Sequence, residues 1–257
     1  MAPRAVTHVA RLSRGTVTTL LGLSVVVVLC WWYLIDMASG MDAMPMTSML
    51  TFRPWTPDYF LAMFLMWAVM MVAMMVPSAV PMILLYRQVA YRNACSRAGL
   101  GTALFVSGYI AVWTLFSLAA TVLQWQLETL ALMSPAMKSN SLVFSAVVLI
   151  AAGLYQWSPW KDACLRQCQS PFHFIMQRWR PGPLGALSMG LLHGSFCVGC
   201  CAFLMGLLFV GGVMDLTVIA LIAIVVLLEK ILPWYRVVPR LLGSAAMLLG
   251  LLLLAQV

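Results

Sequence analysis

Charged residues are scarce in this sequence. Of its 257 residues, 9% are charged and 63% are hydrophobic. One soluble core cannot bury such a large share of apolar side chains, so much of this surface must face lipid. The sequence also lacks internal repeats and low-complexity tracts, and its polar connecting segments are too short to fold alone. We therefore expect one membrane domain, 1–257, with the lipid bilayer as its surroundings.

Acidic residues are rarer still, with seven against fifteen basic ones and a formal net charge of +8. In a soluble protein this excess would suggest a nucleic-acid partner. Here we expect no nucleic-acid partner, because the basic residues gather in alternate loops between the apolar segments, as they do in membrane proteins. The sequence also lacks a P-loop, a nucleophile elbow and a dinucleotide-binding fingerprint. These absences argue against ATP-driven pumping by this chain and favour a binding or transport protein over an enzyme.

Seven apolar stretches are long enough to cross a membrane. About 20 apolar residues are needed, because the hydrocarbon core is about 30 Å thick and a helix rises about 1.5 Å per residue. All seven should be helical, since an open sheet cannot satisfy its backbone in lipid. The sequence thus predicts an all-α polytopic protein with about seven spans, at residues 17–35, 59–86, 102–125, 141–157, 183–209, 216–232 and 241–255.

The basic residues predict the orientation of these spans. Thirteen of them lie in one set of alternate loops, and only Arg53 and Lys138 lie in the other, which also holds five of the seven acidic residues. Lys and Arg that flank a span stay on the cytoplasmic side. We therefore expect the N-terminus inside and the C-terminus outside.

The fifth apolar stretch carries a stripe of metal-ligand side chains. Met189, His193, Cys197, Cys200 and Cys201 fall on neighbouring parts of one helix face at about 100° per residue. Imidazole and sulfur bind Cu(I) and Zn(II), and soft sulfur donors favour Cu(I), so zinc is the weaker fit. One helix cannot complete a coordination sphere, so donors from other spans are required. The alternative is that these residues only pack between helices.

Two residue pairs in the C-terminal half of the chain have structural rather than metal-binding interpretations. Gly190 and Gly194 form a G-x-x-x-G pattern, which is typical of closely packed membrane helices. Glu229 and Lys230 lie near the inner end of the sixth stretch, where we expect them to pair with each other and reach the interface. A role for Glu229 in proton coupling is the alternative.

A second pair of thiols precedes the fifth stretch, in the predicted cytoplasmic loop. Cys164 and Cys168 are four residues apart, so both thiols share one face if the loop is helical there. The pair is a candidate for metal binding or for redox chemistry.

Methionine is abundant, with twenty residues concentrated in two places. Met41, Met44 and Met46 lie in the polar external loop, where methionine has no core to fill. Met70 and Met74 continue the pattern into the second span. Thioethers bind Cu(I) without deprotonation, so the pattern predicts a copper route from outside. The alternatives are an interfacial segment and flexible packing.

Four motifs together resemble those of a known family. They are Met74-Met75-Val76-Pro77-Ser78, Cys164-x3-Cys168-x2-Pro171-Phe172, the stretch from Gly185 to Cys201, and Glu229-Lys230. Over about residues 63–251 the chain resembles a bacterial family of predicted metal-binding integral membrane proteins. The resemblance implies a location in the bacterial inner membrane, and metal binding by His193 and the cysteines.

The leading hypothesis is a copper-handling membrane protein that works without ATP hydrolysis. It would capture Cu(I) through the external methionines, hold or pass it at the fifth-span site, and deliver it to the Cys164–Cys168 pair. The expected partners are the metal ion and a copper chaperone or a cuproenzyme. Two alternatives stay open, namely a thiol–disulfide oxidoreductase that uses the Cys197, Cys200 and Cys201 cluster, and a membrane assembly or scaffold protein.

Overall fold

The computed structural model describes residues 14–42, 54–93, 98–134, 137–232 and 236–256. Within these ranges the regular structure consists of helices, with a single isolated β-bridge between Met133 and Ser139. The predicted all-α class is confirmed. The helices are α1 (Arg14–Asp42), α3 (Pro57–Arg92), α4 (Ala98–Thr129), α5 (Leu142–Gln156), α6 (Pro159–Gln169), α7 (Pro171–Arg178), α8 (Gly182–Gly206), α9 (Leu208–Gly211), α10 (Leu216–Ile231) and α11 (Val237–Leu254).

Helix starts follow local capping chemistry. The hydroxyl of Ser158 accepts a hydrogen bond from the amide of Lys161, and Pro159 occupies the first turn of α6. The carboxylate of Asp215 accepts from the amides of Thr217 and Val218 at the start of α10. Such side chains satisfy amide groups that have no partner inside the helix, and so they fix where each helix begins.

Five helical segments in the described ranges are long and apolar enough to cross a membrane: Gly15–Gly40, Pro57–Arg92, Ala98–Thr129, Gly182–Gly211 and Val237–Leu254. A sixth results if α5 and α6, which are bent by 65° at their junction, count as one span. The 16 residues of α10 extend about 24 Å, less than the usual hydrocarbon thickness. The seven-span arrangement and its orientation therefore stay predictions.

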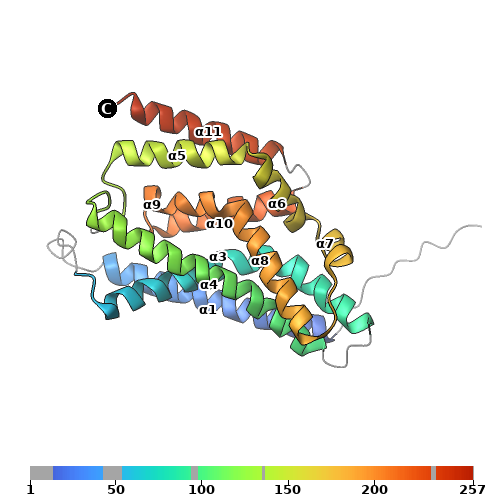
Figure 1. Ribbon diagram of the computed structural model, residues 1–257. Coiled ribbons are helices and arrows are strands. Elements are labelled where there is room, and N and C mark those ends of the chain that lie inside the picture. Colours follow the sequence, from blue (N-terminus) through green and yellow to red (C-terminus); the bar gives the residue numbers. More distant parts are fainter. Residues whose placement is uncertain (1–13, 43–53, 94–97, 135–136, 233–235, 257) are drawn as a thin grey trace, which may run out of the picture.

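The helices form two groups joined by α8 and α10 (Figure 1). Helices α1, α3 and α4 lie along one side, where α3 packs against both of the others. Helices α5 and α11 pair on the opposite side, and α6 and α7 lead from α5 to α8. Helix α8 packs most extensively against α4 and also contacts α6. Residues on α8 therefore face side chains from both groups.

Glycines let α4 and α8 approach backbone to backbone. A Cβ atom added to Gly108 of α4 would lie 2.5 Å from the carbonyl oxygen of Leu187. A Cβ atom on Gly190 of α8 would collide with the carbonyl of Phe105, and one on Gly194 would lie 3.2 Å from that of Tyr109. The predicted close packing at Gly190 and Gly194 is confirmed. It also brings the aromatic side chains of α4 next to the face of α8 that carries the predicted metal ligands.

Candidate metal centre

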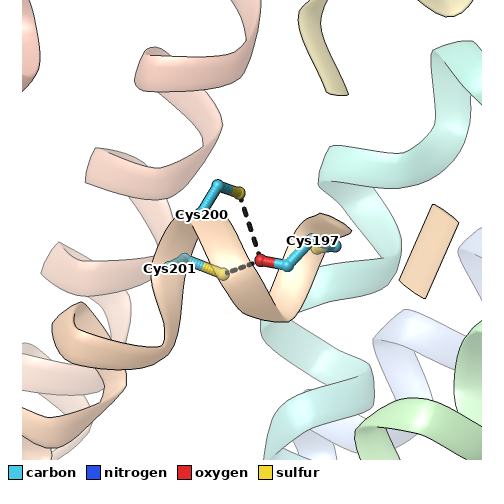
Figure 2. Close-up of side chains that lie close together, drawn as sticks. All are labelled: Cys197, Cys200 and Cys201. Carbon is cyan, nitrogen blue, oxygen red and sulfur yellow. Dashed lines mark hydrogen bonds between the residues drawn. The ribbon is translucent and has the colours of Figure 1, made fainter. Parts of the chain in front are cut away.

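Three cysteines of α8 form a compact buried cluster, which we call the α8 trio: Cys197, Cys200 and Cys201. Their sulfur atoms all lie within 4.8 Å of one another, and each residue is at most 1% exposed. The thiols of Cys200 and Cys201 donate to the carbonyl oxygen of Cys197 at 3.1 and 2.8 Å (Figure 2). Spacings of three and four residues place the side chains on one helix face, as the sequence predicts.

A buried lysine contacts this cluster. The Lys230 Nζ donates to the sulfur of Cys197 at 2.9 Å and to the hydroxyl of Ser78 at 2.7 Å. The ion pairs among the described residues do not include Lys230. Burying an ammonium without a counter-charge costs free energy, and the Cys197 sulfur is the contacting group that could carry a negative charge. The ammonium in turn stabilises a thiolate at that sulfur.

The predicted pairing of Glu229 with Lys230 is wrong. Glu229 accepts instead from Lys161 of α6 at 2.7 Å and from Gln156 at 3.0 Å, and this ion pair is almost fully buried. Consecutive helical residues point about 100° apart, so the two side chains face different neighbours. Glu229 faces α6, while Lys230 faces α3 and α8.

Helices α3 and α4 complete the surroundings of the α8 trio. The Tyr109 hydroxyl lies 3.1 Å from the sulfur of Cys197 and donates to the carbonyl of Met75. The Met75 thioether accepts from the thiol of Cys201 at 3.9 Å. Sequence reasoning singled out Met70 and Met74, which are buried in the same helix. Periodicity alone could not show that Met75 is the one that contacts the cluster.

His193 lies one helical turn before Cys197 and is almost fully buried. Its ring stacks on those of Phe105 and Tyr109, with centroids 6.0 and 5.5 Å apart, and Phe174 meets it edge-on. Its Nδ1 atom has no hydrogen-bond partner among the described residues. His193 is not a member of the compact three-sulfur group. The structure thus places it beside the α8 trio, in an aromatic cage.

Met189 occupies the far end of the predicted stripe. Its sulfur accepts a hydrogen bond from the Arg180 amide at 3.4 Å. Eight residues separate it from Cys197, which corresponds to about 12 Å along a helix. The structure therefore separates Met189 from the α8 trio.

Cys164 and Cys168 both lie on α6, which packs against α8. The Cys168 sulfur lies 4.0 Å from the sulfur of Cys200. The Cys164 sulfur lies over Gly199, where an added Cβ atom would come within 2.8 Å of it. Both residues are partly exposed. The structure thus brings this pair, which the sequence placed in a separate loop, onto the α8 trio.

The external methionines cannot be placed relative to this centre. Met41 belongs to the last turn of α1. Its side chain, Met44 and Met46 all lie outside the described residues.

The donor set suits a soft metal ion. Three thiols on one helix form the compact group, the thiol of Cys168 on α6 lies 4.0 Å from Cys200, and the thioether of Met75 on α3 lies 3.9 Å from Cys201. Sulfur ligands of this kind bind Cu(I) well, and four thiolates would also satisfy tetrahedral zinc. The buried position excludes water, and the neighbouring ammonium offsets part of the negative charge of the sulfurs.

Comparison with curated proteins and with solved structures finds no match. A family model does match, that of PpoB2, whose description is copper chaperone. The match covers residues 64–253, well over half of the chain, and this range includes the α8 trio, both cysteines of α6 and Lys230. On this basis the chain belongs to the PpoB2 copper chaperone family.

Proposed function

We propose that this protein binds Cu(I) at the α8 trio and captures, transports or delivers it without ATP hydrolysis. The observation that carries the proposal is the compact set of three buried sulfur atoms within 4.8 Å of one another. Membership of a copper chaperone family supports copper as the metal. Zinc is the alternative ion, because the same sulfur donors can bind it.

The charges at the centre are compatible with Cu(I). Two thiolates and one Cu(I) ion carry a net charge of −1, and the Lys230 ammonium, 2.9 Å from Cys197, brings the sum to zero. A buried site with little net charge avoids the large cost of desolvating an unpaired ion. In the metal-free protein, a thiolate at Cys197 would already balance the Lys230 ammonium.

The proposed path of Cu(I) extends to both sides of the α8 trio. Met41, Met44 and Met46 would capture Cu(I) outside, Met70 and Met74 would guide it through α3, and the cysteines of α6 would receive it. His193 would support the ion beside the α8 trio, and Met189 would offer a thioether about 12 Å before the trio on α8. The chain would form one membrane domain with seven spans in a bacterial inner membrane, and its partner would be a copper chaperone or a cuproenzyme.

One distance favours a second function. The sulfurs of Cys168 and Cys200 lie 4.0 Å apart on different helices. A disulfide needs them about 2.05 Å apart, so a modest movement of α6 would allow one. The protein would then act as a membrane thiol–disulfide oxidoreductase, and the two electrons and two protons would pass to a partner disulfide or oxidant.

Metal analysis of the purified protein separates these functions. We would purify the protein in detergent under anaerobic, reducing conditions, add Cu(I), and measure bound copper after removal of the excess. Stoichiometric copper that is lost in Cys197→Ser supports the proposal. The matched control is Cys30→Ser, which removes a half-buried thiol of α1 outside the cluster and should leave copper binding unchanged. A reversible disulfide without bound metal would instead establish the oxidoreductase.

A further inference from the structure

Cys168 is where the buried sulfur cluster meets the surface. It lies on α6, a separate and more polar helix, whereas the α8 trio is almost fully buried. Its sulfur lies 4.0 Å from that of Cys200. Metal–sulfur bonds of about 2.3 Å, as found for zinc, place two opposite sulfurs about 4.6 Å apart. A separation of 4.0 Å therefore accommodates one ion held by both sulfurs at a bent angle.

The approach of α6 to α8 depends on a glycine. Gly199 precedes Cys200, and a Cβ atom there would lie 2.8 Å from the Cys164 sulfur. A larger residue would crowd the Cys164 thiol at this contact. Within the part of the chain that the structure describes, the other heavy atom close to that position is the Cys164 Cβ, so the glycine leaves room for the cysteine side chain.

Helix α6 is also tied to the end of α10. The Lys161–Glu229 ion pair joins the two helices at 2.7 Å, and the Gln169 side chain donates to the carbonyl of Leu232 at 3.2 Å. These contacts lie at opposite ends of α6. They fix the helix along its length and so hold Cys168 against Cys200.

We propose that Cys168 and Cys200 form a two-sulfur hand-over site, through which Cu(I) leaves the α8 trio. This inference rests on the proposed function. Cys200 remains bound to the ion during the exchange. A bond from copper to the Cys168 sulfur forms, and a bond to one other trio sulfur breaks. The proton that the Cys168 thiol gives up ends on the released sulfur, so the charge and the Cu(I) state stay unchanged.

The half-buried Cys168 then presents the ion to an acceptor thiol or chelator at the surface. Direct release from Cys197 or Cys201 would require the whole cluster to open, because both are enclosed by α3 and α4. The exchange through Cys168 needs only one new bond at a time. Cys168 thus governs the rate of transfer, while the α8 trio governs how much copper is held.

The test measures copper content and transfer rate separately. The purified, Cu(I)-loaded protein is mixed with the chelator bathocuproine disulfonate, and the coloured copper complex is followed in a stopped-flow instrument. We expect Cys168→Ser to transfer each copper ion that it holds on the order of 10-fold more slowly than the wild type, equivalent to a modest rise in the barrier. Cys30→Ser is the matched control and should transfer at the wild-type rate.

A second variant tests the geometry without removing any sulfur. Gly199→Ala crowds the Cys164 side chain at the contact between α6 and α8, and it should also slow transfer while copper content stays unchanged. Gly206→Ala on the same helix is its control, because an added Cβ atom there meets nothing within 4 Å.

The outcomes distinguish the two proposals. Wild-type transfer rates in Cys168→Ser would overturn the hand-over site while leaving copper binding intact. Copper loss in Cys168→Ser as large as in Cys197→Ser would also overturn it, since Cys168 would then be a permanent ligand. A wild-type protein that binds no copper would refute the proposed function itself.

Discussion

Replacing Lys230 with methionine removes a buried cation that contacts the α8 trio and keeps a side chain of similar length. The Lys230 Nζ lies 2.9 Å from the Cys197 sulfur. At an effective dielectric constant of about 20, a full charge pair at this separation attracts by about 6 kcal/mol. Desolvation of both ions offsets much of that gain. If about 1.4 to 3 kcal/mol remains, the variant should bind Cu(I) about 10- to 100-fold more weakly.

The assay is competition for Cu(I) between the purified variant and bathocuproine disulfonate at fixed pH and under reducing conditions. Helix content and the thermal unfolding midpoint show whether the variant still folds. The control is Lys138→Met, because Lys138 is exposed and lies outside the cluster. In the Cys197→Ser background, Lys230→Met should have little further effect, since its charge acts through that sulfur. An unchanged affinity, or fully additive effects, would refute this reasoning.

Three further predictions concern topology, capture and the imidazole. A reporter fused after Val257 should be external and one placed within 158–182 cytoplasmic, because basic residues stay inside; a cytoplasmic C-terminus would rule out the seven-span arrangement. His193→Ala should weaken Cu(I) binding less than Cys197→Ser, because His193 lies outside the three-sulfur group. An equal loss of affinity would make it a direct ligand. Leucine at all three external methionines should lower copper uptake at low supply without loss of folding, since leucine keeps the volume and removes the sulfur. Unchanged uptake would leave an interfacial role for Met41, Met44 and Met46.

The sequence predicted the helices and the α8 trio through simple periodicities. Apolar length identified the spanning candidates, although α10 is shorter than the others. The spacing of Cys197, Cys200 and Cys201 required one face in any helix, so their proximity did not depend on tertiary structure. The close packing at Gly190 followed in the same way from a local pattern. Each of these predictions needed information from a single helix.

Contacts between helices were much harder to predict. Met75 of α3 accepts from the Cys201 thiol, although Met74 is buried in the same helix, because the rotation of α3 is set by its packing on α1 and α4. Likewise, nothing local showed that α6 would bring Cys168 onto Cys200. The family motifs contained a usable signal here. Met75 and Ser78 of one motif meet Lys230 of another at the centre.

The error at Glu229 and Lys230 shows how α10 organises the centre. Opposite charges in adjacent positions look like a local ion pair, yet on a helix they diverge by about 100°. Glu229 binds Lys161 and so holds α6 and its cysteines in place, while Lys230 binds Cys197 and Ser78 and so joins α8 to α3. Both side chains are buried, so neither can change partner without exposing a charge to an apolar interior. One turn of α10 therefore holds the helix that carries the hand-over thiol and places an ammonium on a sulfur of the α8 trio, which links copper retention to copper release.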